Sequence, residues 1–82
     1  MTRSIALRTY WGDWMKLSMS ETQLFKLRAH LQAGSTKTIA LGGHVFRPQG
    51  DVLFFANSGT PSKYYFEMSP QEVIAVIDEA LS

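Results

Sequence analysis

The chain has 82 residues, of which 45% are hydrophobic and 18% are charged, and it contains no cysteine. This length supports one domain over residues 1–82, and the composition is typical of a globular protein. The lack of cysteine excludes disulfides and thiolate metal sites, and a net charge of +1 is too small to indicate a nucleic-acid partner by itself. No stretch approaches the roughly 20 apolar residues of a membrane span, and no signal-peptide pattern is present. We therefore expect a cytoplasmic protein with no membrane partner.

The first predicted element is a β-hairpin. Residues 4–11 and 14–19 have the composition of two strands, and they are separated by Gly12 and Asp13, a two-residue loop that favours a type II′ turn. Pairing across this turn predicts three opposite pairs, Trp11–Trp14, Thr9–Lys16 and Leu7–Ser18. The alternative is a helix that starts at Asp13 and continues to Ala33, but a capping sequence in the middle of that stretch argues for a break.

Two capping sequences predict two helices. Ser20 and Ser69 are each followed, three residues later, by a Gln or Glu that can bond back to the cap, which is the spacing of a capping box. The first helix is expected over residues 21–33, with Gly34 as a left-handed C-cap. The second is expected over residues 70–81 and is apolar over more than half of its surface. Such a helix contacts a sheet and a neighbouring element together, or a second copy of the protein.

The remaining segments favour strands, at residues 36–41, 44–46, 52–56 and 63–67. Gly42 and Gly43 predict a tight turn between the first two of them. A second turn is predicted at residues 48–51, with Pro48 at its first corner and Gly50 in the left-handed position. The resulting order, ββ-α-ββββ-α, predicts a small single-domain α+β fold in which an antiparallel sheet carries both helices on one face.

No segment has a catalytic or metal-binding pattern. His30 and His44 are isolated, without the H-x-H or H-E-x-x-H spacing of a metal site. Strand alternation places His44 on one face with Phe46, and Arg47 on the other, so we expect a structural role for this histidine. Neither glycine turn opens a helix in a phosphate-binding pattern. We expect no enzymatic activity, no catalytic residue, no metal and no cofactor.

The aromatic residues are more informative than the polar ones. Tyr10, Trp11 and Trp14 surround the predicted hairpin turn, and residues 64–66 are three consecutive aromatics. Successive side chains of a strand point to opposite faces, so several of these rings must be exposed or covered by another molecule. Exposed Trp and Tyr are frequent anchors of protein interfaces. The alternative is that the two tryptophans close the open end of the protein's own core.

These patterns lead to a functional expectation. We expect a small non-catalytic protein-binding module of the inhibitor or adaptor type, as also found in phages and mobile elements, that forms a homodimer. The predicted partner-binding residues are Tyr10, Trp11, Trp14, Arg47 and Tyr65. The alternative is a single-stranded nucleic-acid-binding protein that uses the sheet-face residues Arg47, Lys63, Tyr64 and Phe66. It is less favoured because the RNA-recognition consensus is absent and because Arg8 and Lys16 are predicted on opposite faces of the hairpin.

Overall fold

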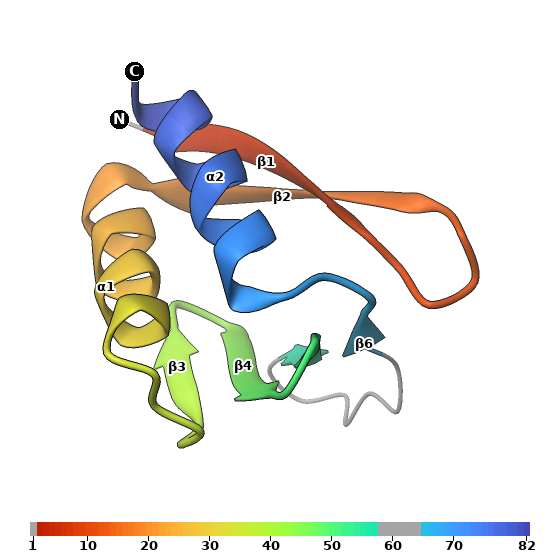
Figure 1. Cartoon of the computed structure of the whole chain (residues 1–82). Coiled ribbons are helices and arrows are strands. Elements are labelled where there is room, and N and C mark those ends of the chain that lie inside the picture. The colour runs from red at the N-terminus through yellow and green to blue at the C-terminus, as the bar shows by residue number, and fades with distance from the viewer. Residues whose placement is uncertain (1, 58–64) are drawn as a thin grey trace.

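The computed structural model describes residues 2–57 and 65–82 (Figure 1). These residues form six strands and two helices in the predicted order. In chain order they are β1 (Thr2–Arg8), β2 (Trp14–Ser20), α1 (Glu21–Gln32), β3 (Ile39–Leu41), β4 (His44–Gln49), β5 (Val52–Asn57), β6 (Tyr65–Phe66) and α2 (Pro70–Leu81). The strand pairs are antiparallel, so the predicted α+β fold is confirmed. Within the described ranges, neither helix is long and apolar enough to cross a membrane.

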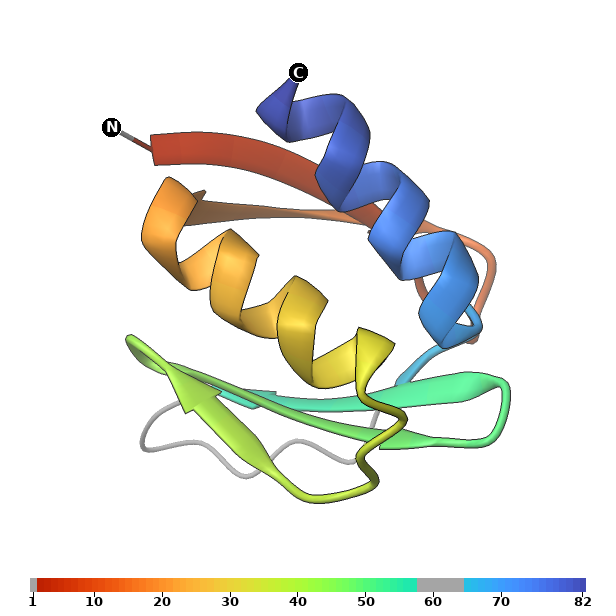
Figure 2. The ribbon, with the colours of Figure 1, turned by 60° about the vertical axis from the view of Figure 1, so that its left-hand side comes forward.

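The described strands divide into two sheets, where the sequence predicted one. β1 and β2 form a hairpin, and β3 to β6 form a second sheet in chain order. The two sheets meet just beyond β1, where Thr9 bridges to Phe66 and the N–H of Tyr10 donates to the carbonyl of Tyr65 at 3.1 Å. The hairpin and the four-stranded sheet thus lie on either side of the core, and both helices close the core along one side (Figure 2).

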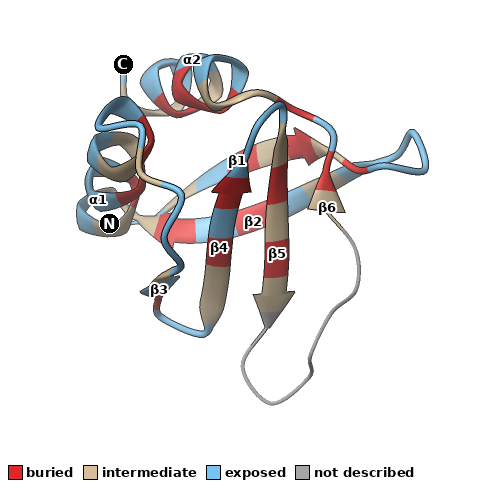
Figure 3. Cartoon of the chain, turned by 60° about the horizontal axis from the view of Figure 1, so that its bottom comes forward, coloured by how far each residue is buried: buried red, intermediate tan, exposed pale blue. Residues whose placement is uncertain are grey.

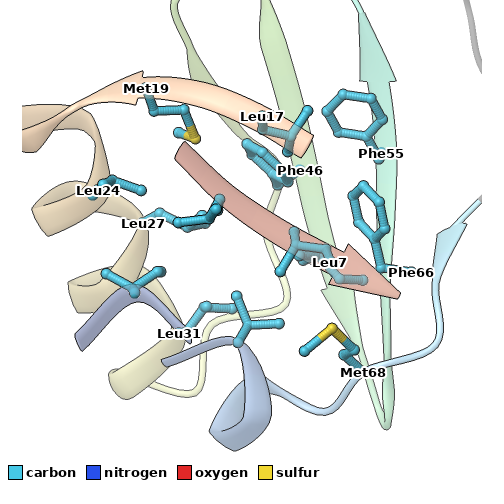
Figure 4. Close-up of a cluster of buried hydrophobic side chains, with 14 of the residues drawn as sticks. Leu7, Leu17, Met19, Leu24, Leu27, Leu31, Phe46, Phe55, Phe66 and Met68 are labelled. Atoms are coloured by element: carbon cyan, nitrogen blue, oxygen red, sulfur yellow. The ribbon is translucent and has the colours of Figure 1, made fainter. Parts of the chain in front are cut away.

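The core is built from alternate strand residues and from one stripe on each helix (Figure 4). Its fully buried apolar residues are Leu7, Met19, Leu24, Leu27, Phe46, Leu53, Phe55, Phe66, Val73 and Ile77. Burying one such side chain contributes roughly 1.5–3 kcal/mol relative to leaving it in water. The hairpin, the second sheet and both helices supply members of this set, so each element depends on the others for cover.

Both helices begin at the predicted capping boxes. The Ser20 hydroxyl accepts from the N–H of Gln23 at 3.1 Å, and the Gln23 side chain accepts from the N–H of Ser20 at 3.0 Å. Ser69 and Glu72 form the same two bonds, at 3.3 and 3.1 Å. α1 ends one residue before the predicted boundary, and Gly34 adopts the predicted left-handed conformation with φ +70°. Short-range chemistry therefore accounts for the helix boundaries.

The predicted register of the hairpin is wrong. Leu7 pairs with Met15 and Ile5 pairs with Leu17, and the connecting loop comprises residues 9–13 instead of Gly12 and Asp13 alone. The buried apolar residues of both strands occupy odd-numbered positions, and opposite residues share a face of the sheet. A two-residue turn at Gly12 and Asp13 would pair odd with even positions and place the apolar sets on opposite faces. The observed register brings both sets to the core.

The same register corrects the expected placement of two cations. Ala6 pairs with Lys16 and Arg8 pairs with Trp14, so Arg8 and Lys16 lie on one face of the hairpin and not on opposite faces. This is the face turned away from Leu7 and the core.

The turn between β4 and β5 also differs from the prediction. Pro48, predicted at the first corner, lies inside β4, and the turn comprises Gly50 and Asp51 alone. The two residues that flank a two-residue turn are hydrogen-bonded to each other, and the next pair along the strands is not. Pro48 belongs to this next pair, so its ring nitrogen points away from β5. β3 begins at Ile39 and not at Thr36, and it does not extend alongside Pro48. Proline therefore occupies a position where its missing N–H removes no ladder hydrogen bond.

Candidate binding surface

The outer face of the four-stranded sheet carries a row of large side chains. Along β4 and β5, buried residues alternate with residues that face outward (Figure 3). Arg47 is paired with Phe54 across β4 and β5, and Phe54 is paired with Tyr65 across β5 and β6. The backbone hydrogen bond from Tyr10 to Tyr65 places the loop after β1 next to these paired residues. We call Trp11, Tyr10, Tyr65, Phe54 and Arg47 the aromatic row.

Members of the aromatic row contact one another in sequence. The rings of Trp11 and Tyr10 meet edge to face with centroids 4.9 Å apart, and Tyr10 stacks on Tyr65 at 5.0 Å. Tyr65 and Phe54 have centroids 5.5 Å apart, and the guanidinium carbon of Arg47 lies 4.6 Å from the centroid of Phe54. These are the separations at which aromatic pairs and cation–π pairs attract. The row is therefore a connected surface that spans three strands and a loop.

The loop that presents Tyr10 and Trp11 is tied to its own base. Thr9 is fully buried, and its hydroxyl donates to the carbonyl of Asp13 at 3.0 Å and accepts from the N–H of Asp13 at 3.1 Å. The indole N–H of Trp11 donates to the carboxylate of Asp13 at 3.1 Å. Side chains such as Thr and Asp stabilise turns through local bonds of this kind. The loop thus holds both rings outward, with Tyr10 48% and Trp11 49% exposed.

A shallow cavity of about 220 Å³ lies at the Arg47 end of the aromatic row. Its lining residues are Thr38, Val45, Arg47, Phe54, Phe55 and Ala56. Arg47 is the charged member of this set, and its guanidinium also donates to the side-chain oxygen of Gln49 at 3.0 Å. Four of the six lining residues are therefore apolar, and Arg47 is the one cation among them.

A polar cluster links the end of β1 to the start of α2, next to the end of β6. A guanidinium nitrogen of Arg8 donates to the carbonyl of Glu67 at 2.6 Å and lies 3.6 Å from the carboxylate of Glu72. The hydrogen bond from the N–H of Ser69 lowers the pKa of Glu72, partial loss of solvation opposes this, and the Ser69 hydroxyl and Arg8 lower the pKa further. The cluster positions the strand end from which the Tyr10 loop departs.

The structure brings together four of the five predicted partner-binding residues, namely Tyr10, Trp11, Arg47 and Tyr65. Trp14 lies outside the row, opposite Arg8 on the outer face of the hairpin, and is 60% exposed. The two tryptophans therefore do not close the protein's own core. Phe54 was missed as a site residue, although the alternation of β5 already pointed its ring away from Phe55.

The alternative set for nucleic-acid binding is changed by burial. Phe66 is completely buried, so its ring is not available for stacking on a base, which corrects that expectation. Lys63 and Tyr64 lie outside the described residues. Arg47 is the remaining member of the set with a described, exposed side chain.

His44 lies on the opposite side of the sheet from the aromatic row. The ring of His44 packs against Phe46 and Phe55, on the face predicted from alternation. The described residues contain no group of three or more His, Cys, Asp or Glu side chains arranged to hold a metal ion.

No protein-family model matches the sequence, and comparisons with curated proteins and with solved structures find no match.

Proposed function

We propose that this protein is a small non-catalytic binding module that docks a protein partner on the aromatic row. The observation that carries the proposal is the row itself, in which four rings and one guanidinium are held in contact on the solvent side of a folded sheet. Large, stiff and amphipathic side chains of this kind dominate the binding energy of protein interfaces.

The organisation of the row supports binding in a second way. Association costs free energy because side chains and loops become ordered, and this cost is smaller when the surface is already held in place. Trp11 is fixed by Asp13, and Tyr10 is fixed by its stacking on Tyr65 and by its backbone bond to β6. Much of the ordering cost at this surface is therefore met during folding.

We extend the proposal to the mode of action. A single small domain that binds without chemistry serves as an inhibitor or an adaptor, and we place it in the cytoplasm. We also propose a homodimer, because Val76 and Ala80 of α2 are only partly buried and border a hollow of about 320 Å³ beside β1. Sedimentation analysis over a range of concentrations tests the dimer. A measured mass equal to that of one chain at every concentration contradicts the dimer.

The docking proposal is tested with variants of two row residues and a matched control. Tagged wild-type protein, Trp11→Ala, Tyr65→Ala and Phe25→Ala are compared for capture of proteins from a native lysate treated with nuclease. Phe25 is 58% exposed but lies on α1, so it controls for loss of an exposed apolar ring. We expect the two row variants to lose the same captured protein and Phe25→Ala to retain it.

The size of the effect follows from the behaviour of interface anchors. Truncation of an anchor typically costs about 2 kcal/mol or more, which corresponds to roughly a 30-fold weaker affinity. Equal capture by all four proteins would contradict the proposal, as would a loss caused by Phe25→Ala alone.

A second candidate function is single-stranded nucleic-acid binding on the same row. The observation that favours it is the guanidinium of Arg47 lying over the Phe54 ring beside the ring of Tyr65, because bases stack on aromatic rings while cations contact phosphates. Fluorescence anisotropy with labelled oligonucleotides at increasing salt tests this function. Binding that weakens steeply with salt and is lost in Tyr65→Ala supports it, and salt-independent or absent binding contradicts it.

A further inference from the structure

We infer that the partner segment recognised by the aromatic row is an acidic, apolar peptide, which presents a carboxylate to Arg47 and an apolar side chain to the cavity beside it. This inference rests on the proposed protein-binding function and adds the chemistry of the partner. It is carried by three observations: the pairing of the arginines, the fixed position of Arg47 and the lining of the cavity.

The four arginines of the chain differ in how they are neutralised. Arg3 is paired with Glu21 at 3.0 Å, Arg8 with Glu72 at 3.6 Å, and Arg28 with Asp78. Within the described residues, Arg47 is the arginine that has no carboxylate partner; its contacts are the Gln49 amide and the Phe54 ring. The guanidinium without a described carboxylate partner is thus the one that lies on the proposed binding surface.

Arg47 is held in a position suited to accept an anion. Its guanidinium carbon lies over the Phe54 ring, and one nitrogen donates to the side-chain oxygen of Gln49, which leaves other N–H groups of this exposed side chain available to an anion. A guanidinium binds a carboxylate through two parallel hydrogen bonds, and less entropy is lost when the fork is already oriented. The fold therefore presents a prepared half of an ion pair.

The cavity next to Arg47 indicates what accompanies the carboxylate. Its volume of about 220 Å³ is below the roughly 300–1,000 Å³ of pockets that hold a drug-sized ligand. Val45, Phe54 and Ala56 supply apolar walls. A single aliphatic or aromatic side chain suits this size and lining. A short peptide segment can supply one apolar side chain next to one acidic side chain.

A phosphodiester chain fits the same site less well. A single strand of nucleic acid carries one charge at each nucleotide, and proteins that bind it present several cations along its path. Among the residues that line the cavity and those of the aromatic row, Arg47 is the one cation. The charge of the site therefore matches one carboxylate better than a run of phosphates.

The test uses a displayed library of random peptides as the probe. The library is selected on wild-type protein, on Arg47→Glu, on Lys26→Glu and on Trp11→Ala. Lys26→Glu makes the same change of charge on the exposed side of α1 and serves as the matched control. We expect wild type and Lys26→Glu to enrich peptides with Asp or Glu beside a large apolar residue. Arg47→Glu should enrich Lys or Arg at that position instead, and Trp11→Ala should enrich none of these peptides.

Affinity measurements on one enriched acidic peptide make the test quantitative. We expect Arg47→Glu to bind it at least about tenfold more weakly than wild type, and Lys26→Glu to bind it equally well. An unlabelled poly-dT oligonucleotide is added as a competitor. Failure of the oligonucleotide to displace the peptide supports the inference, and displacement at lower concentration than the unlabelled peptide overturns it in favour of phosphate recognition.

The remaining outcomes separate this inference from the proposed function. Peptides that require Trp11 but show no acidic preference, and are bound equally by Arg47→Glu, would overturn the acidic-peptide inference and leave the protein-binding function standing. A selection in which no enriched peptide depends on Trp11 or on Arg47 would overturn both. All four proteins are first compared by circular dichroism, so that a folding defect is not scored as a change in specificity.

Discussion

The two faces of the four-stranded sheet carry similar side chains in different surroundings. The inner face has a row made of Phe46, Phe55 and Phe66, and the outer face has Arg47, Phe54 and Tyr65. Inner ring centroids lie 5.3 and 5.2 Å apart, close to the 5.5 Å between Phe54 and Tyr65 outside. Contact between rings therefore does not distinguish the faces.

Cover by other elements does distinguish them. Leu7 and Leu17 of the hairpin lie over the inner rings (Figure 4), and Phe46 and Phe66 are completely buried. The free energy gained from a ring scales mainly with the apolar area that it removes from water. The inner rings therefore stabilise the fold, whereas the outer rings of Phe54 and Tyr65 are only partly buried and leave apolar area exposed.

Phe54 and Phe55 provide the most direct comparison, because they are adjacent and point to opposite faces. We expect Phe55→Ala to cost about 3–5 kcal/mol, as is usual when a buried ring is replaced by Ala. This approaches the whole stability of roughly 3–5 kcal/mol expected for so small a domain, so the variant should be largely unfolded. Phe54→Ala should remain folded and cost less than about 1.5 kcal/mol.

Urea unfolding followed by circular dichroism measures this difference, and Phe55→Leu gives a graded variant if Phe55→Ala does not fold. Peptide binding measured on the folded variants completes the comparison, since Phe54→Ala should lose binding and Phe55→Leu should retain it. Equal destabilisation by Phe54→Ala and Phe55→Ala would show that the outer face is covered in solution.

The turns at the two ends of β4 repeat the contrast between packed and open surroundings. Gly42 and Gly50 both have positive φ, +55° and +60°, as the sequence predicted for these turns. A Cβ atom on Gly42 would collide with the side-chain nitrogen of Gln23, whereas a Cβ atom on Gly50 would meet nothing within 4 Å. Gln23 is held in the capping box of α1, so it cannot move away without loss of that cap.

We therefore expect Gly42→Ala to destabilise more than Gly50→Ala. The left-handed conformation costs an Ala residue about 1–2 kcal/mol at either position, and a disturbed helix cap adds about 1 kcal/mol at Gly42. Thermal unfolding of the two variants measures the difference. Equal losses would mean that Gln23 reorients freely and that only the backbone conformation matters.

The two capping boxes give the smallest expected effect. α1 uses the uncharged Gln23 and α2 uses Glu72, whose pKa is lowered chiefly by the N–H of Ser69. A carboxyl with a lower pKa in the folded than in the unfolded chain stabilises the fold at pH above its unfolded pKa. That stabilisation is lost as the pH falls through the folded pKa, below about pH 4.

Glu72→Gln should remove this part of the acid sensitivity while retaining an acceptor for the Ser69 N–H. We expect its melting temperature to fall less between neutral pH and pH 3 than that of wild type, and differential scanning calorimetry measures both. Gln23→Ala, which alters a cap without a titrating group, should leave the pH dependence unchanged. A steeper fall in Glu72→Gln than in wild type would contradict the assigned direction of the pKa.

Much of the candidate surface follows from short-range patterns. Alternation along β4 and β5 predicted that Arg47 would face away from His44 and Phe46, and the structure agrees. Alternation also implied that Phe54 and Phe55 would separate, so the outer ring of Phe54 could have been included. The hairpin prediction failed because Gly12 and Asp13 favoured a tight turn locally, whereas the buried residues of both strands required another register.

The sequence determined the elements of this protein, and only the tertiary structure decided which of them meet. Capping boxes, left-handed glycines and strand alternation depend on bonds and steric limits within a few residues, so they can be identified from neighbours in the chain. The bridge from Thr9 to Phe66 and the stacking of Tyr10 on Tyr65 join residues more than 50 positions apart. Such contacts form only because burying the shared core repays the entropy of bringing distant segments together.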